Sequence, residues 1–431
     1  MADITVDPGM AVSRSPLPLP LASESAPTAW RAEWYPHRDW APLLPAWRAS
    51  QQCYGWDDLG AHPDWCRGLE EVYPGSVQLL LLYRRHELAA VVPLIVKRME
   101  LDCHLGELHL AQFRPRVAQL AGAFSGLPQN EPAFRAFFDA LLRRSDRPRG
   151  ERQRSDRPRS ERQRSDRPRI DAVRFALPTD SPLWAYLASP DFARFGLRRY
   201  QPNPPAPHHL IHLPPTLQDY FAKFTPKTRK NRFRELKYLE QRGPVELAQF
   251  SRPDQVDPFL AAASALSCRS YQHKLLKAGL RAPDQLRRRL QVAAEHGWLR
   301  SYVLRCAGTD CSYMLGYQFH GRYHYTKVGY DPDWAKLCVG TVLQLLVLHD
   351  LYARDTPAVF DFGPQGPQKQ YFGNDSFLEG DVFFFRPGLY PWLARTSHRS
   401  SRRLTARTGA LLDRFQLKPR AQRLLRRLAG C

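Results

Sequence analysis

The chain has 431 residues, of which 43% are hydrophobic, with 10 Trp, 18 Tyr and 22 Phe; this composition supports more than one packed domain and excludes an intrinsically disordered protein. The formal net charge is +21, but an Arg-rich stretch at 144–169 contributes +6 and residues 386–431 contribute +11, which leaves +4 for the rest. A nearly neutral body lacks the basic face on which nucleic-acid affinity depends, so the charge argues against nucleic acid as a partner.

The cysteines and the lengths of the apolar runs indicate the cellular compartment. The eight Cys are scattered without a CxxC pair, which favours reduced thiols and no metal site. The N-terminal residues are acidic where a signal peptide needs a basic region, and the apolar runs fall well short of the roughly 20 residues that span a bilayer. The sequence therefore predicts a cytoplasmic protein.

The first half of the chain reads as a leader followed by a mixed α/β domain. Residues 1–29 are rich in Pro, Ser and Ala, which predicts a disordered leader. The predicted elements that follow are a β-hairpin at 77–83 and 88–96, a helix at 131–142 and a strand at 171–178. The Pro-rich stretch QPNPPAPHH at 201–209 predicts an interdomain linker, with the boundary near Pro205.

A ten-residue unit, RSDRPRGERQ, repeats almost unchanged through 144–169 and contains no apolar side chain. Such a segment cannot offset the entropy of ordering its backbone, so we expect a mobile loop. It is either an insertion by repeat slippage into a tolerant surface loop, which we favour, or an electrostatic tether to nucleic acid or anionic lipid.

The second half reads as helices, an antiparallel meander and then alternating helices and strands. The predicted helices lie at 216–241, with a break at Pro226, at 257–276 and at 339–352, with a short helix-like segment at QKQYFG. The predicted strands lie at 299–306, 311–319, 323–328, 358–362 and 380–386, the last of which closes the unit.

This order is that of the GNAT fold. The strings GYQFHGRYHYTKVGYDPDWAKLCVGTVLQLLVLHDLY and VFDFGPQGPQKQYFG, with TRKNRFRELKYLEQRG and SYQHKLLKAGL upstream, resemble the CelD/BcsL-like acetyltransferase domain of bacteria, a family associated with cellulose and other polysaccharide synthesis. The hairpin ending in VVPLIVKR resembles the first half of the same proteins. One departure from the family matters, because Gln368 stands where a Tyr commonly precedes Lys369.

The resemblance implies a mixed α+β fold of two tandem GNAT-like domains, each with a central mixed sheet flanked by helices, as in the FemAB-like aminoacyltransferases. We expect an N-terminal domain at 30–205, a C-terminal acetyltransferase domain at 206–390 and a basic helical tail at 391–431. The end of the tail, PRAQRLLRRLAG, is amphipathic, so it either packs on its own domain or rests on an anionic membrane surface.

The implied reaction is transfer of an acetyl or longer acyl group from acyl-CoA to an amine, such as an amino sugar or a polysaccharide or envelope precursor. Unpaired backbone N–H groups at the start of the helix at 339–352 suit the coenzyme's pyrophosphate. The predicted binding loop consists of Leu337, Cys338, Val339, Gly340 and Thr341.

For the base, Asp331 and His324 have tunable pKa values. Asp331 could instead make a turn before Pro332, and His324 could be a packed strand residue. Lys369 either binds an anionic acceptor or is solvated, and Arg229 and Asp361 are candidate acceptor-binding residues.

Two other functions remain open on the sequence. One is FemAB-like transfer of an aminoacyl group from charged tRNA to a cell-wall precursor. The other is a degenerate GNAT domain that acts as a binding module, because the predicted phosphate loop departs from the usual GNAT signature.

Overall fold

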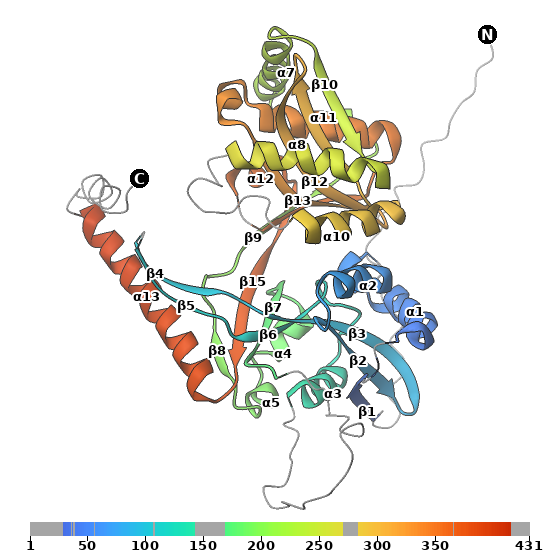
Figure 1. Ribbon diagram of the computed structural model, residues 1–431, viewed down its shortest axis with the longest axis vertical. Coiled ribbons are helices and arrows are strands. Elements are labelled where there is room, and N and C mark those ends of the chain that lie inside the picture. The colour runs from blue at the N-terminus through green and yellow to red at the C-terminus, as the bar shows by residue number, and fades with distance from the viewer. Residues whose placement is uncertain are drawn as a thin grey trace, which may run out of the picture.

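The computed structural model describes residues 29–414 apart from Pro36, Arg38, Trp56, Glu107, Gln365 and the segments 143–168 and 270–282. The chain forms two lobes, the first half building one and most of the second half the other (Figure 1). The Arg-rich repeat, almost all of the predicted leader and the amphipathic end of the tail fall outside the described residues.

In the described residues, thirteen strands form one sheet that runs through both lobes. Its order is β1-β2-β3-β6-β7-β15-β9-β14-β13-β12-β11-β10, with β8 also paired to β15, and β4 and β5 form a separate hairpin. The strands of the first half are β1 (Trp30–Trp34), β2 (Val77–Arg84), β3 (Glu87–Arg98), β4 (Leu101–Leu105), β5 (Leu108–Phe113), β6 (Arg116–Leu120), β7 (Ala172–Pro178) and β8 (Arg198–Tyr200). Those of the second half are β9 (Ala206–His212), β10 (Val245–Phe250), β11 (Ser301–Cys306), β12 (Thr309–Phe319), β13 (Arg322–Tyr330), β14 (Val359–Pro364) and β15 (Asp375–Phe385).

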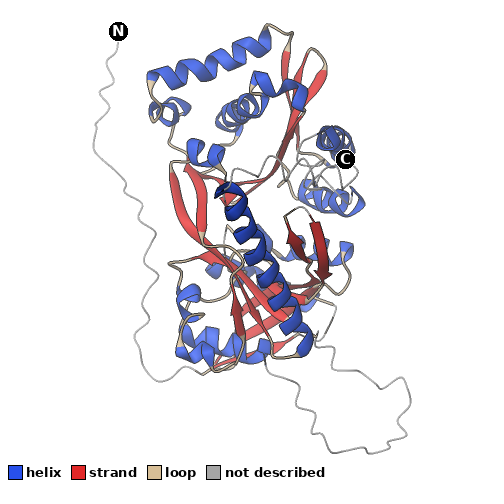
Figure 2. Ribbon diagram, turned by 90° about the vertical axis from the view of Figure 1, so that its left-hand side faces the viewer, coloured by secondary structure: helices blue, strands red, loops and turns tan. Residues whose placement is uncertain are grey.

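Helices cover both faces of this sheet. One face packs under α3 (Glu131–Leu142), α4 (Pro182–Tyr186) and α5 (Pro190–Ala193) in the first lobe, and under α6 (Leu217–Ala222), α7 (Pro226–Glu240) and α11 (Val339–Arg354) in the second. The other face carries α1 (Leu44–Tyr54), α2 (Pro63–Val72), α8 (Val256–Arg269) and α10 (Pro283–Glu295). The long α13 (Leu389–Arg414) lies along the hairpin β4-β5 (Figure 2).

Most predicted elements are confirmed where apolar periodicity was strong. The hairpin β2-β3, the helix α3 and the meander β11-β12-β13 stand at the predicted places. The break at Pro226 is also confirmed, because Thr225 caps α7 with its side chain while Pro226 occupies the first turn. The strand β10 and the helix α10 were not predicted.

Two expectations about the middle of the sheet were wrong. The Pro-rich linker predicted at 201–209 continues into β9, which is a central strand between β14 and β15. The final strand, β15, does not belong to the second unit alone, because it pairs with strands of both halves of the chain. Its residues Asp375 to Glu379 pair with β9, and Glu379 to Phe385 pair with β7 of the first half. These two strands carry the sheet across the junction.

The two lobes share one hydrophobic core. Residues of α1 and α2 and residues of α8, α10 and β12 belong to the same buried cluster. The rings of Trp65 and Tyr317 lie 5.2 Å apart across the junction, and a side chain at Gly68 would meet Val292 at 2.9 Å. Packing of this kind fixes the lobes to each other. Among the described residues, no helix is both long and apolar enough to cross a membrane.

Candidate functional site

The strands β13 and β14 separate after three residue pairs. They pair in parallel from Arg322 opposite Val359 to His324 opposite Asp361, and β13 then continues beside β12 alone. At the next step β13 is bulged, because Leu315 and Gly316 of β12 pair with Lys327 and Tyr325 and leave Thr326 without a partner.

The strand β14 is also irregular just past the same point. Gly363 has φ +70°, a left-handed conformation that glycine adopts without strain, and the register with β9 shifts between Asp361 and Gly363. The two strands therefore open a gap whose apex lies at His324 and Asp361.

His324 stands at the apex of this gap with an unpaired ring nitrogen. Its Nε2 is buried and has no hydrogen-bond partner among the described residues. Burial lowers the pKa of His324 to about 4, although the nearby charge of Asp361 opposes this. The imidazole is therefore uncharged at neutral pH and can accept or relay a proton.

Lys369 reaches the gap from the short helix α12 (Pro367–Phe372). Its Nζ donates a hydrogen bond to the carbonyl oxygen of Pro364 at 3.0 Å and lies 5.7 Å from the centre of the Tyr325 ring. Burial lowers the pKa of Lys369, while the charges of Asp361 and Glu379 raise it.

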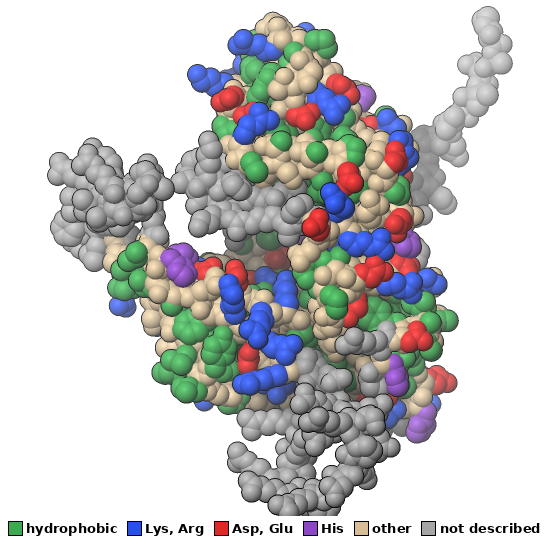
Figure 3. Space-filling view, in the orientation of Figure 1, with side chains coloured by type: hydrophobic (Ala, Val, Ile, Leu, Met, Phe, Trp, Pro, Cys, Tyr) green, Lys and Arg blue, Asp and Glu red, His purple; other side chains and the backbone are tan. Residues whose placement is uncertain are grey.

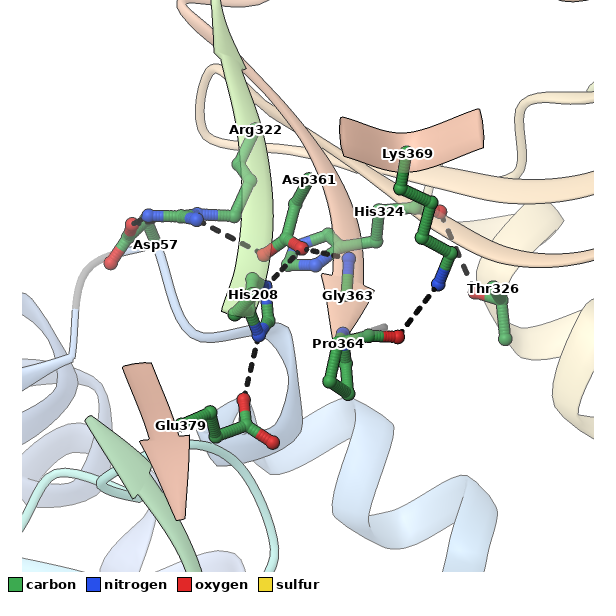
Figure 4. Close-up of polar contacts among 10 residues, drawn as sticks. All are labelled: Asp57, His208, Arg322, His324, Thr326, Asp361, Gly363, Pro364, Lys369 and Glu379. Carbon is green, nitrogen blue, oxygen red and sulfur yellow. Dashed lines mark hydrogen bonds and ion pairs between the residues drawn. The ribbon is translucent and has the colours of Figure 1, made fainter. Parts of the chain in front are cut away.

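A chain of charged side chains runs from the first lobe through the apex to β15 (Figure 4). Arg322 donates from Nη2 to Asp57 at 2.6 Å and from Nη1 to Asp361 at 3.1 Å. His208 then bridges two carboxylates, with Nε2 at 2.7 Å from Asp361 and Nδ1 at 2.6 Å from Glu379. Four elements and both lobes thus meet at one polar cluster.

The bridging position decides the charge of His208. Burial disfavours the imidazolium, but the hydrogen bonds to Asp361 and Glu379 outweigh it and raise the pKa of His208 to about 9. The pKa of Asp361 shifts in the opposite direction. Burial would raise its pKa, but His208 and Arg322 lower the pKa to about 2. At neutral pH His208 is therefore a cation held between two carboxylates, and it cannot serve as a base.

The predicted phosphate loop lies at the start of α11, at the open end of the gap. Cys338 is left-handed, with φ 53°, and makes no side-chain cap. The N–H groups of Thr341 and Val342 turn back to the carbonyl oxygen of Cys338, so those of Val339 and Gly340 are the first unpaired donors of the helix. A Cβ at Gly340 would meet only Tyr330, at 4.0 Å, so the surface above these donors is open. Leu337 is half-buried and ends the preceding 3-10 helix.

Asp331 does not join His324 at the apex. Six residues of extended chain lie between them, about 20 Å along β13. The carboxylate of Asp331 is buried, pairs with Arg269 at 2.8 Å and accepts the N–H of Asp333 at 3.2 Å. These are the contacts of a turn-forming carboxylate. Arg229 is half-buried on α7, and its side chain makes no hydrogen bond or ion pair with any described residue.

The structure brings the predicted residues Asp361, His324 and Lys369 together with groups that the sequence reasoning did not name. His208 lies in the Pro-rich stretch that predicted a linker, and Arg322 lies in a string that carried the family resemblance but was given no role of its own. Glu379 comes from the shared strand and Asp57 from the other lobe. Within the described residues, no group of three or more His, Cys, Asp or Glu side chains is placed to hold a metal ion.

Comparison with known families and structures agrees with this architecture. Residues 226–375 match the family model described as an acetyltransferase (GNAT) domain. The second half of the chain carries a GNAT domain. A crystal structure of FemX is similar in fold, with a TM-score of 0.51 at 9% identity over 80% of this chain and 96% of that one. The fold of the whole chain is therefore a tandem GNAT-like fold with one mixed sheet flanked by helices.

Two further solved structures show weaker similarity. A tandem GNAT protein from the clavulanic acid biosynthesis pathway has a TM-score of 0.46 at 13% identity, covering 84% of this chain and 100% of that one. The L-PGS structure from Bacillus licheniformis has a TM-score of 0.44 at 12% identity, covering 82% and 96%. No curated protein matched the sequence.

Proposed function

We propose that this protein transfers an acetyl or longer acyl group from acyl-CoA to an amine acceptor, at the gap between β13 and β14. The observation that carries the proposal is the separation of these two strands at His324 and Asp361, directly after their short parallel pairing. The chain after β13 leads directly to the N-terminus of α11, which has no side-chain cap, so unpaired helix donors follow the strand that carries the buried imidazole of His324.

The residues at the open end fit the coenzyme's pyrophosphate. The N–H groups of Val339 and Gly340 and the helix dipole favour an anion there, and the absence of a side chain at Gly340 lets a phosphate come close. Cys338 and Thr341 shape the turn. Coenzyme A would supply the acyl group as a thioester, and the bulge at Thr326 leaves backbone groups of β13 free to polarise its carbonyl.

The apex supplies the remaining functions. His324 is neutral at physiological pH and is the group best placed to take a proton from the attacking amine. Asp361 is held ionised beside it and orients the approach of a cationic acceptor, while Lys369 offers positive charge at the gap and Arg229 offers a further cation on α7. We infer an amino sugar or another polysaccharide or envelope precursor as the acceptor, which rests on the resemblance to the CelD/BcsL-like domains.

Aminoacyl transfer from charged tRNA is the second candidate, and one surface favours it. The helix α7 carries six Lys or Arg against two Glu, and Phe233 and Tyr238 are exposed on it. Basic and aromatic side chains together suit a nucleic-acid strand. The near-neutral body of the chain weighs against it.

Calorimetry of the full chain with acetyl-CoA, charged tRNA and duplex DNA in turn separates these functions. We expect saturable binding of acetyl-CoA alone. Binding only of charged tRNA would favour the second candidate, and binding only of DNA would favour a degenerate domain that acts as a binding module.

His324→Gln tests the chemistry, with calorimetry for binding and a thiol-release assay for the rate. This variant should keep the acetyl-CoA affinity within about threefold and lower the rate of thiol release with an amine acceptor by roughly 10²-fold, the usual scale of a general base. The exposed His212→Gln is the matched control, since it also removes an imidazole from the same sheet. An unchanged rate in His324→Gln would remove this residue from the reaction.

A further inference from the structure

The face of the sheet that carries the apex residues continues into the first lobe as a row of polar side chains. Paired residues of neighbouring strands point to the same face. By this rule Tyr317, His324 and Asp361 share one face across β12, β13 and β14. Within β15, Glu379 and Asp381 follow on the same face, and Asp381 pairs with Arg174 of β7 at 2.8 Å.

Two hydrophobic clusters border this row and leave it open. The cluster under α1, α2 and α10 ends on one side, and the cluster under α13 and β4 ends on the other. Lys and Arg side chains gather on the surface between them, over the strands of the first lobe beside α13 (Figure 3). The open strip is therefore basic where it enters the first lobe.

Three cations converge at this end. The registers of β3, β6 and β7 place the side chain of Lys97 on the same face of the sheet as those of Gln119 and Arg174. Part of the Lys97 side chain is exposed to solvent. The pKa of its ammonium is lowered, first by desolvation and then by the positive charges of Arg174 and Arg289. Both neighbouring charges are positive, and Lys97 forms no ion pair with a described carboxylate. Two of the cations, Lys97 and Arg289, thus lack a compensating anion.

Arg289 provides an independent sign of a missing ligand. It comes from α10 in the second lobe, with its guanidinium 5.2 Å above the ring of Trp65. Its Nε is buried and has no hydrogen-bond partner among the described residues. The buried hydroxyl of Tyr317, on which the charge of Arg289 acts, is unpartnered as well. Unpaired buried donors are costly and call for a partner.

We propose that Lys97, Arg174 and Arg289 form an oxyanion subsite that holds a phosphate or carboxylate group of the acceptor while its amine reaches His324. This inference rests on the proposed acyl transfer for the role of the site, but not for its existence. Tyr317 pairs with His324 at one strand spacing, about 4.8 Å between backbones, and the charge of Arg289 acts on its hydroxyl, so Tyr317 links the subsite to the apex. The acceptor is accordingly a small molecule that bears an amine and an oxyanion together.

Protection of Lys97 from acylation tests the subsite directly. The full chain is pulsed with acetic anhydride, with no coenzyme or acceptor present, and the labelling of each lysine is read by peptide mass spectrometry. Inorganic phosphate and acetate are compared with chloride at equal ionic strength. We expect at least one of the two oxyanions to slow labelling of Lys97 by fivefold or more, while the exposed Lys237 of α7 is labelled at an unchanged rate.

Variants on α10 supply the matched controls. Arg289→Met should abolish the protection, and Arg289→Lys should retain part of it. Arg288→Met removes one charge from the same helix but not from the subsite, since Arg288 pairs with Glu71 at 2.6 Å, and should keep the protection. Phosphate acting alone indicates a phosphorylated acceptor, and acetate acting alone a carboxylate.

Equal labelling of Lys97 in phosphate, acetate and chloride overturns the subsite, as does protection that survives Arg289→Met. Neither result affects acetyl-CoA binding at α11. Conversely, failure of acetyl-CoA to bind would leave the protection of Lys97 intact, so the two inferences fail separately.

Discussion

Replacement of His208 by Gln tests whether the charged chain at the apex stabilises the fold as its geometry implies. The imidazolium lies between Asp361 and Glu379 at 2.7 and 2.6 Å, and its side chain is only 12% exposed, so solvent screens it weakly. A rise of the pKa from 6.5 to about 9 corresponds to about 3 kcal/mol of stability while the imidazole is charged.

The sign of the pH dependence follows from the raised pKa. The contribution is fully present below the unfolded pKa of about 6.5 and is lost as the pH rises through about 9. Lys223 acts in the opposite sense, because burial lowers its pKa to about 8, so only the difference between wild type and variant isolates His208.

Urea unfolding followed by Trp fluorescence at pH 6, 7.5 and 9.5 measures that difference. We expect it to shrink by about 2 to 3 kcal/mol between the first and the last pH. The control is His212→Gln, whose imidazole pairs with Asp375 at 2.8 Å but is 56% exposed, so its effect should stay below about 1 kcal/mol. Parallel pH profiles for wild type and His208→Gln would refute the assignment of the bridging charge.

Two further variants separate binding and structure at the other end of the gap. Gly340→Ala should leave the free energy of unfolding unchanged or raise it by about 0.5 to 1 kcal/mol, because Gly340 is helical and its added Cβ meets nothing closer than 4.0 Å. In calorimetry the same variant should bind acetyl-CoA at least tenfold more weakly. An unchanged affinity would place the pyrophosphate elsewhere. Asp331→Asn should lower the free energy of unfolding in urea by about 1 to 3 kcal/mol, because Asp331 is buried while its partner Arg269 is half-exposed. The affinity for acetyl-CoA should not change. A stable variant with turnover reduced a hundredfold would instead make Asp331 catalytic.

How far the sequence predicted this molecule depended on whether the signal was local. Apolar periodicity located β2, β3, α3 and α11 because each buries a face set by its own residues. β9 was missed because four prolines at 202–207 mask its start, yet those prolines precede or open the strand, where a missing N–H costs nothing. The division of β15 between two partners has no local signature at all.

The site shows the same division between local and long-range information. His324 and Asp361 were proposed because each lies in a string with a recognisable pattern, but their pairing across β13 and β14 depends on the fold. Glu379 lies 171 residues from His208, and Asp57 lies 265 residues from Arg322. Contacts at such separations arise only from tertiary structure.

The shared strand β15 links the two halves of the chemistry. Its first residues extend the sheet of the GNAT domain beside β9, and its later residues complete the sheet of the first lobe beside β7. Glu379 is the residue of β15 that pairs with both β9 and β7, and its carboxylate fixes His208 near the apex. Asp381 of the same strand holds Arg174 at the proposed oxyanion subsite. A rigid strand between two binding groups fixes their separation, so we infer that selection among acceptors depends on the distance between amine and oxyanion. The first lobe would then contribute acceptor specificity to the proposed reaction, whose acyl donor we propose to bind at α11 in the second lobe.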